Sequence, residues 1–483
     1  MNKNVILAID QGSSGTRAFA VDASGAVLYK RTEVLCAEHP REGYAQYDAA
    51  KLLESQLVVL NELLDKLEEE EVSAIAVSSQ RSTVVLWNRR TGEPLAPALS
   101  WQDGRASKEA DAVSFPQQDI HKLTGLYKTP FYSAAKIAWC LKNIPAVQKA
   151  AQKGELAVGP VATYLIWRLT NGEVFAIDPT LAQRTLLFNI HTGDWDEDLL
   201  NAFGVKRAFL PQIRPSQADY GMYEYKERRV PIVVCVGDQQ ASLAGMGLKE
   251  GSSSINYGTG AFFLHNTGRE LKQIPGILTS VAASGTDGKC DFILEGPVNA
   301  SGVIFTWLKE LGFDVDLEEL DLLYSQAQNP VWFLPALGGL GAPYWDFTVS
   351  PVFSGFTPQT KKADVAAGVL RGIAFLLADI AYYIKNYGVS IGDIKVSGGL
   401  ANIQSLLKFQ ADILQTRLLK CPETESTAMG TAWLAAQALN IDTSSWSLFT
   451  TCEEIKPAVS PEEAELLNRR WRTFLDWCRT QQK

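Results

Sequence analysis

Histidine and methionine are scarce in this chain of 483 residues, which has four of each. No two histidines stand within helical reach of one another, so a histidine-based metal site is not expected and Asp and Glu remain as the candidate ligands. The seven cysteines are odd in number and form no CxxC pair. This pattern predicts free thiols in a reducing cytosol.

An excess of positive charge is also lacking, since 45 Lys and Arg stand against 54 Asp and Glu, a net charge of −9. This balance argues against binding to nucleic acid or to an anionic membrane, both of which reward a basic surface. The amino-terminal apolar stretch is short and ends in an acid, unlike a signal peptide, and no run of about 18 apolar residues follows. We therefore expect a cytoplasmic protein without a membrane or nucleic-acid partner, and the sequence leaves open whether copies assemble into a homo-oligomer.

Two nucleotide-binding signatures are missing from the chain. There is no GxxxxGK[ST] segment, which excludes a P-loop site, and the spacing and lysine of the protein-kinase signature are absent as well. Any nucleotide must therefore be held by another kind of loop.

Strands alternate with amphipathic helices along the first half. An apolar strand over residues 5–9 is expected to end before Asp10, and a glycine turn over 11–15 leads into a second strand over 16–21. Leucines recur at helical spacing over 51–67. Further strands are expected over 74–77 and 84–87. The pattern indicates an α/β protein with layered sheets.

The middle of the chain repeats this opening in outline. A strand over 254–257, a turn at Gly258–Gly260 and a strand over 261–264 follow the same order, and a strand over 232–236 runs into Asp238. The later elements are expected as helices over 363–387, 403–414 and 427–438 and strands over 394–396 and 418–419. We predict a duplicated fold around a cleft, with the domain boundary near 245–251 and domains at 1–247 and 248–483.

Three glycine turns follow strands, at residues 12–15, 258–260 and 398–399. Their backbone N–H groups, together with the hydroxyls of Ser13, Ser14 and Thr259, could donate to an anion. One such turn alone is more often a plain turn. Three of them beside two strand-end aspartates favour a site for polyphosphate transfer.

Two aspartates are the leading catalytic candidates. An aspartate after a strand is usually a turn or helix-cap residue. Asp10 and Asp238, however, follow strands that should be buried, where a carboxylate is partly desolvated unless it meets a cation. We predict a Mg²⁺-binding or catalytic role for both. Arg81 could form a cleft wall or be a surface cation, and Trp101 could pack in the core or face the carbon skeleton of a ligand.

An ordered series of segments resembles the FGGY carbohydrate kinases, most closely their glycerol kinase branch. The resemblance extends from residue 9 to about residue 430. The matching segments are Ile9-Asp10-Gln11-Gly12, Gln80-Arg81, Thr91-Gly92-Glu93-Pro94, Trp101-Gln102-Asp103, the seven residues 184–190 (RTLLFNI), Gly237-Asp238-Gln239-Gln240, Tyr257-Gly258-Thr259-Gly260, the eight residues 339–346 (GLGAPYWD) and Phe409-Gln410-Ala411-Asp412.

The resemblance implies an α/β fold of two actin-like (ribonuclease-H-like) domains that close over ATP, Mg²⁺ and a small polyol or sugar. It makes Asp238 the base that takes the proton of the attacking hydroxyl, and Asp10 and Asp238 the carboxylates at the metal. The residues that it places at the phosphates and the nucleotide are Gly12, Ser13, Ser14, Arg17, Gly258, Thr259, Gly302, Thr306, Gly398 and Gly399. The residues that it places at the acceptor are Arg81, Ser82, Trp101, Phe131, Asp238, Gln239 and Phe262.

Two departures from the glycerol kinase pattern affect the acceptor pocket. Ser82 stands where glycerol kinases carry a glutamate, and Phe131 stands where they carry a tyrosine. A carboxylate that accepts hydrogen bonds from glycerol contributes about 1.5–3 kcal/mol, and the phenol about 1 kcal/mol more. We therefore expect a larger polyol or a ketose as the preferred acceptor, with glycerol secondary. Compensation by Tyr132 or by water stays open, so a true glycerol kinase is the alternative.

Three other departures are less informative about function. Thr306 replaces a glutamine near the nucleotide, which weakens its own assignment. Arg371 replaces an acid, and residues 348–351 replace a region that carries an Arg-Gly pair.

Two functions of another class share the same loops, namely an ATPase of the actin or chaperone type and a degenerate kinase that senses a sugar. Arg81, Trp101 and the segment at 237–240 favour a kinase, because an actin-type ATPase needs no polyol pocket. The intact Asp10 and Asp238 speak against a sensor.

Overall fold

The structure is a computed structural model that describes residues 4–68, 71–421, 425–446 and 452–482. It divides into two compact units. Unit 1 consists of Met1–Gly247, Ser280–Phe292 and Thr424–Leu448, and unit 2 of Leu248–Thr279, Ile293–Glu423 and Phe449–Lys483. The last two segments of unit 1 follow the predicted boundary at 247/248 in the chain and nevertheless pack with the amino-terminal part.

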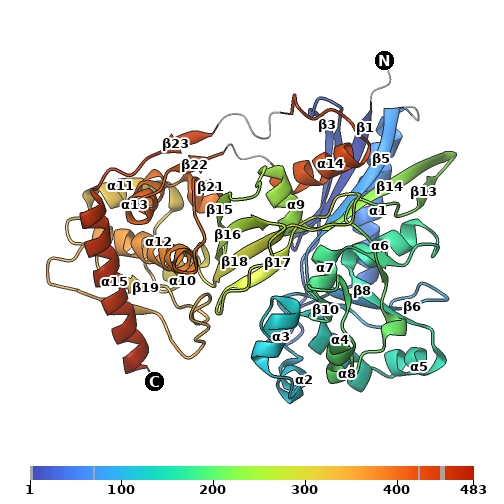
Figure 1. The fold of residues 1–483 in the computed structure, drawn as a ribbon, viewed down its shortest axis with the longest axis horizontal. Coiled ribbons are helices and arrows are strands. Elements are labelled where there is room, and N and C mark those ends of the chain that lie inside the picture. The colour runs from blue at the N-terminus through green and yellow to red at the C-terminus, as the bar shows by residue number, and fades with distance from the viewer. Residues whose placement is uncertain (1–3, 69–70, 422–424, 447–451, 483) are drawn as a thin grey trace. The chain divides into compact units, whose positions relative to one another are not determined.

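A six-stranded sheet forms the centre of unit 1, in the order β13-β14-β5-β1-β2-β3 (Figure 1). Strands β1, β2 and β3 are antiparallel neighbours, whereas β5 pairs parallel to β1 and β14 pairs parallel to β5. The bounds are β1 Val5–Gln11, β2 Gly15–Val21, β3 Val27–Val34, β5 Val72–Ser79, β13 Met222–Tyr225 and β14 Arg228–Gly237.

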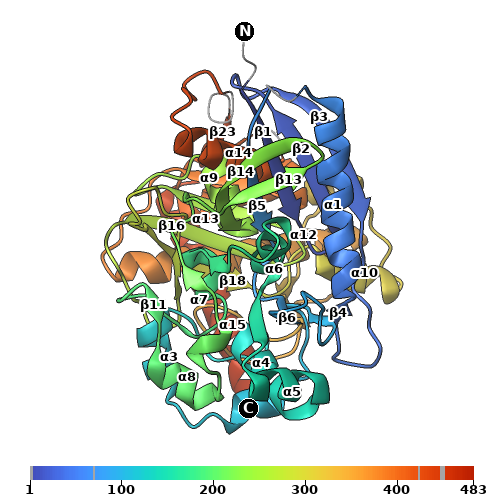
Figure 2. The same cartoon turned by 90° about the vertical axis from the view of Figure 1, so that its right-hand side faces the viewer.

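Helices cover both faces of this sheet. Helix α1 (Ala49–Lys66) begins at Asp48, whose side chain accepts from two free N–H groups of the first turn, and it packs along β2 and β3 (Figure 2). Helix α14 (Ser426–Ala438) packs on β1 and β5 and against α9 (Asp238–Gly245). Every residue of β1 is buried, because both of its faces are covered.

A smaller layer of unit 1 contains a four-stranded sheet in the order β4-β7-β6-β8, surrounded by short helices. Its strands are β4 Gln46–Tyr47, β6 Val84–Asn88, β7 Ala98–Leu99 and β8 Leu156–Pro160. Its helices are α2 Ser107–Ala112, α3 Gln117–Thr124, α4 Ser133–Asn143, α5 Pro145–Lys153, α6 Val161–Leu169, α7 Pro179–Gln183 and α8 Glu197–Phe203. Two-residue strands pair nearby: β9 Ala176–Ile177 with β12 Gln212–Ile213, and β10 Phe188–Asn189 with β11 Asp194–Trp195.

Unit 2 is built on a seven-stranded sheet in the order β17-β18-β16-β15-β21-β22-β23. Its strands are β15 Ser253–Tyr257, β16 Ala261–Gly268, β17 Leu278–Val281, β18 Phe292–Val298, β21 Ile394–Ser397, β22 Leu418–Lys420 and β23 Glu453–Ile455. A two-stranded sheet pairs β19 Trp332–Leu334 with β20 Val352–Ser354. The helices are α10 Val303–Glu310, α11 Leu320–Gln326, α12 Lys362–Asn386, α13 Gln404–Leu414 and α15 Pro461–Gln481.

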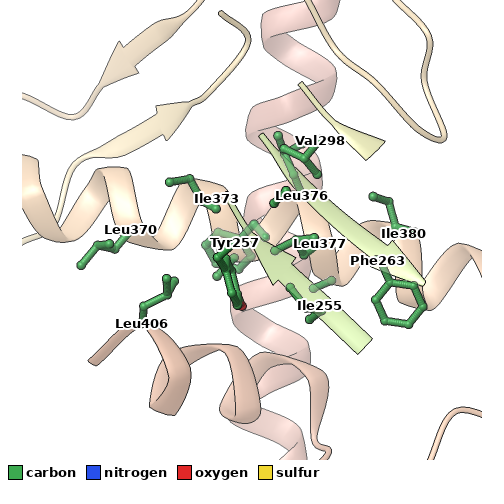
Figure 3. Close-up of a cluster of buried hydrophobic side chains, with 14 of the residues drawn as sticks. Ile255, Tyr257, Phe263, Val298, Leu370, Ile373, Leu376, Leu377, Ile380 and Leu406 are labelled. Carbon is green, nitrogen blue, oxygen red and sulfur yellow. The ribbon is translucent and has the colours of Figure 1, made fainter. Parts of the chain in front are cut away.

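Helix α12 is the central core helix of unit 2. Its Ile373, Leu377 and Ile380 face the sheet side chains Ile255, Tyr257 and Phe263 in one buried cluster (Figure 3). The helix is long and apolar enough to cross a membrane by length and composition alone, yet 83% of its most apolar window is buried inside the structure. Helix α12 is therefore a core helix of unit 2.

The two large sheets share a local plan. In unit 1 the antiparallel pair β1–β2 lies beside the parallel strands β5 and β14, and in unit 2 the antiparallel pair β15–β16 lies beside the parallel strands β21 and β22. This agrees with the repeat predicted from the sequence and with an α/β fold.

Two expectations from the sequence are wrong in detail. Strand β1 continues through Asp10 to Gln11, because β2 pairs with both residues, so Asp10 lies inside a strand and not after it. Cys421 and Cys452 form a disulfide across a sequence separation of 31 residues, so these two cysteines are not free thiols. The other five are free, namely Cys36, Cys140, Cys235, Cys290 and Cys478.

Candidate active site

Asp10 points to the face of the unit 1 sheet that α14 covers. It alternates along β1 with Ile6 and Ala8, which pack in the cluster that includes α14, and it lies opposite Arg17 of β2. Arg17 donates to the Asp10 carboxylate at 2.5 Å, and the Asp10 side chain is only 2% exposed. Burial raises the pKa of Asp10 to about 6, against the lowering effect of Arg17, and the negative charge of Asp238 raises it further.

Asp238 is the first residue of α9, directly after β14. Its Oδ1 accepts the N–H of Gln239 at 2.7 Å and lies 3.6 Å from Nε of Arg81. Asp10 lies in β1 and Asp238 directly follows β14, and these two strands flank β5. Their register positions are neighbours, since Asp10 pairs with Ser78 and Gly237 with Ser79. The two carboxyl groups are 228 residues apart in the sequence, yet the fold brings them close enough within unit 1 to interact electrostatically.

The turn between β1 and β2 lies beside these acids. The Gly12 N–H donates to the Gly15 carbonyl at 2.9 Å, which closes the turn. The Ser13 carbonyl accepts from the Tyr47 hydroxyl at 2.7 Å, and the Ser13 hydroxyl accepts from the Trp101 indole at 2.9 Å. Ser14, at the tip of the turn, is exposed.

Arg17 connects the turn to a distant helix. Besides Asp10, it donates to Glu425, the residue before α14, at 2.5 Å. Lys30 also forms an ion pair with Glu425. The Arg17 side chain keeps 37% exposure. A cation that is held by two carboxylates and still reaches solvent can move to an entering phosphate at low cost.

Besides Asp238 and Gln239 at the start of α9, the acceptor candidates of unit 1 lie on three short segments. Arg81 and Ser82 follow β5, and Ser82 adopts a left-handed backbone conformation with φ 63°. The Ser82 hydroxyl donates to the carbonyl of Arg184 at 3.3 Å. Trp101 and Phe131 are 41% and 47% exposed, so both side chains are accessible to a ligand.

The remaining candidates lie in unit 2. The Gly302 N–H donates to the Gly258 carbonyl at 2.9 Å, and the N–H of Val303 donates to the Thr259 carbonyl at 3.1 Å, so the start of α10 is joined to the β15–β16 turn. Thr259 and Thr306 are exposed, and Phe262 is half-buried in β16.

The turn at Gly398–Gly399 requires a glycine. Gly398 has φ 93°, and a Cβ there would lie 2.4 Å from the carbonyl oxygen of Tyr257. The backbone of β15 and the residue after β21 therefore approach closely at this point of the unit 2 sheet. Gly399 beside it is exposed, with no heavy atom within 4 Å of an added Cβ.

The two aspartates fit a magnesium ion that is bound only partly by protein. Within the described ranges, no group of three or more His, Cys, Asp or Glu side chains is placed to hold a metal ion. Magnesium commonly takes one or two carboxylates and completes its shell with water and phosphate oxygens. Asp10 and Asp238 could supply these carboxylates, and a cation beside them would offset the repulsion and burial that raise the pKa of Asp10.

Two residues beside the site were missed by the sequence reasoning. No sequence pattern pointed to Glu425, because its partner Arg17 lies 408 residues away in the chain. Lys136 is fully buried in α4 behind the acceptor segments. A lysine flanked by apolar residues within a helix was the signal that could have revealed it.

Comparisons with known proteins cover nearly the whole chain. Residues 5–245 match the N-terminal domain of the FGGY family of carbohydrate kinases, and residues 253–439 match its C-terminal domain. The glycerol kinase of Shewanella piezotolerans is 36% identical over 487 residues, which cover 98% of this chain and 99% of the relative.

Solved structures give the same result at the level of the fold. The glycerol kinase of Plasmodium falciparum with ADP matches with a TM-score of 0.93 and 27% identity, covering 99% of this chain and 98% of that one. The ligand-bound xylulose kinase of Lactobacillus acidophilus shares the fold, with a TM-score of 0.85 and 22% identity over 99% of this chain and 98% of that one.

Proposed function

Because this chain belongs to the FGGY family of carbohydrate kinases, whose members use ATP and Mg²⁺ to phosphorylate an alcohol group, we propose that it prefers a polyol or ketose larger than glycerol. Family membership favours a phosphotransferase over an actin-type ATPase. The proposal concerns the identity of the acceptor and the roles of the residues that would meet it.

The side chain at position 82 is the observation that carries the proposal. Ser82 is 7% exposed, and its hydroxyl donates to the Arg184 carbonyl. A serine at this position offers no carboxylate to a polyol. Phe131 has no hydroxyl to replace that acceptor. The loss of about 2.5–4 kcal/mol in hydrogen bonding corresponds to a weakening of glycerol binding by about a hundredfold or more. The smaller serine also leaves room for a longer carbon chain.

The phosphoryl transfer assigns roles to three charged residues of unit 1, namely Asp10, Arg81 and Asp238. An acceptor hydroxyl oxygen attacks the γ-phosphorus, the bond from that phosphorus to the β–γ bridging oxygen breaks, ADP leaves, and the proton of the hydroxyl passes to the Asp238 carboxylate. Arg81, 3.6 Å from Asp238, orients this base and the acceptor. Magnesium supplies charge neutralisation to the phosphates, and Asp10 and Asp238 would hold it.

The backbone turns supply the remaining contacts in this proposal. Gly12, Ser13, Ser14 and Arg17 of unit 1 would face the phosphates, as would Gly258 and Thr259 of unit 2. Gln239 of unit 1 would line the acceptor pocket with Trp101. In unit 2, Gly302, Thr306, Gly398 and Gly399 are the proposed nucleotide contacts, and Phe262 is a proposed acceptor contact. The exposure of Ser14, Thr259 and Gly399 is compatible with these contacts.

A true glycerol kinase is the second candidate. Its support is the 36% identity to a glycerol kinase along nearly the whole chain. Tyr132, next to Phe131, is the residue that could restore a hydroxyl to the pocket.

A coupled ADP-release assay across glycerol, tetritols, pentitols and ketoses separates the two candidates. We expect kcat/KM for at least one longer acceptor to exceed that for glycerol by about tenfold or more. A glycerol value equal to or above that of every longer acceptor would identify a true glycerol kinase and reject the proposed preference.

A further inference from the structure

Lys136 is a charged side chain enclosed completely within unit 1. It lies on the first turns of α4 and is 0% exposed. Its ammonium group donates to two main-chain carbonyls, that of Ser82 at 2.9 Å and that of Ser100 at 2.7 Å. Burying an ammonium group destabilises a fold unless the group is paired or hydrogen-bonded. Packing alone therefore does not explain a lysine at this position.

The two carbonyls belong to separate segments that carry acceptor candidates. Ser82 follows Arg81, and Ser100 precedes Trp101. The Trp101 N–H donates to the hydroxyl of Thr83 at 3.0 Å, so the two segments are also joined directly. Lys136 is thus the shared donor behind both segments.

The conformation at Ser82 needs this support. Its φ of 63° lies in the left-handed region, which is unfavourable for a residue with a side chain. Its carbonyl is held from α4 by the Ser133 hydroxyl at 3.1 Å as well as by Lys136. Ser133 and Lys136 are three positions apart and so share one face of the helix.

The surroundings of Lys136 weaken its hold on the proton. Burial lowers its pKa to about 7, while the negative charge of Asp103 and the Cys140 thiol oppose this effect and Arg105 adds to it. Asp103 itself accepts from the Arg105 guanidinium at 2.8 Å. A methionine would fill the same volume without the cost of burying a cation, but it would release both carbonyls.

We infer that Lys136 is a positioning residue for the acceptor pocket, fixing the segments of Arg81 and Trp101 relative to each other. The inference rests on the proposed placement of Arg81 and Trp101 at the acceptor. Lys136 itself touches neither the substrate nor the reacting atoms, and it acts through the two carbonyls.

The test compares Lys136→Met with Lys142→Met, a control on the same helix whose side chain is 73% exposed. KM for the best acceptor, KM for ATP and kcat are measured for both. We expect Lys136→Met to raise the acceptor KM by about tenfold and to change the ATP KM by less than about twofold. A merely structural role would reduce the active fraction, and with it kcat, and would leave both KM values unchanged; that result would overturn the inference.

Two further variants keep the inference testable if Lys136→Met does not fold. Ser133→Ala removes only the second donor to the Ser82 carbonyl, and we expect it to raise the acceptor KM about threefold with the ATP KM unchanged. An unchanged acceptor KM in Ser133→Ala would then count against the inference. Arg81→Ala tests the placement of the pocket itself. If the acceptor KM of Arg81→Ala is unchanged, the proposed pocket is wrong. If the acceptor KM is raised in Arg81→Ala but not in the Lys136 and Ser133 variants, only the role of Lys136 is rejected.

Discussion

A chain of ionic contacts around Asp10 sets the chemistry of unit 1. Arg17 bridges Asp10 and Glu425, and Arg81 lies beside Asp238. Each of the two carboxyl groups therefore has a cationic partner, which limits the cost of keeping Asp10 almost fully buried.

Replacing Asp238 with Asn tests its role as the base. We expect kcat to fall by about 10²–10⁴-fold, the usual contribution of a general base, because the amide cannot take the proton. Calorimetric binding of ATP should be largely retained. The matched control is Asp111→Asn, an exposed carboxylate of α2 in the same unit, which should be silent. Near-normal turnover in Asp238→Asn would remove this residue from its assigned role.

The double variant Ser82→Glu with Phe131→Tyr tests the origin of the acceptor preference. Restoring the carboxylate and the phenol should raise kcat/KM for glycerol by about a hundredfold, because both groups accept or donate hydrogen bonds to its hydroxyls. Ser82→Gln provides the control, since it adds similar volume without the charge and should recover much less. If the folded double variant gained no glycerol activity, the pocket would be controlled by other residues.

At the scale of elements, the packing of α9 on α14 places the catalytic candidate. Helix α9 starts with Asp238, and α14 follows Glu425, the partner of Arg17. The two helices approach so closely that a Cβ added at Gly430 would lie 1.8 Å from the carbonyl oxygen of Ala241. Both ends of the ionic network therefore depend on one helix contact.

Gly430→Ala should force these helices apart. Overpacking of this kind costs about 1–3 kcal/mol, so we expect a lower melting temperature together with a reduced kcat, since α9 carries Asp238. Gly392→Ala is the control, because no heavy atom lies within 4 Å of its added Cβ. Equal melting temperatures for the two variants would contradict the close helix contact.

At the scale of the whole molecule, stability depends on a polar group buried in unit 2. Asp379 of α12 accepts the indole N–H of Trp471 at 2.7 Å and also contacts Tyr344. Burial raises its pKa from 3.8 to about 7. The folded state therefore binds more protons than the unfolded state between these values, and Asp379 destabilises the fold increasingly as the pH rises through that window.

Replacing Asp379 with Asn should remove this pH dependence. The amide oxygen can still accept from Trp471, but it carries no charge to be desolvated. We expect the melting temperature of the variant to exceed that of the parent chain at pH 8, with a clearly smaller difference at pH 5. Each kcal/mol corresponds to about 2–4 °C for a unit of roughly 200 residues. Glu318→Gln, at an exposed position, is the control, and a difference that does not vary with pH would refute the expected role of Asp379.

Local patterns predicted the strands beside the glycine turns and several of the long helices. Helix α12 was expected over 363–387 and runs over Lys362–Asn386, and the strand expected over 394–396 is β21, Ile394–Ser397. Apolar periodicity and glycine turns act over a few residues, so they can be read directly from the chain. The end of β1 was placed too early because the pairing of Asp10 and Gln11 with β2 is not visible in β1 itself.

The sequence alone determined the α/β class, the glycine turns and the identity of the two central aspartates, because each of these follows from residue types at short spacing. Only the tertiary structure decided what surrounds them: the pairing of Cys421 with Cys452, the contact of Arg17 with Glu425, and the two carbonyls bound by Lys136. Such contacts join residues that are far apart in the chain. Their partners are chosen by how strands and helices pack, a property that no local stretch of sequence contains.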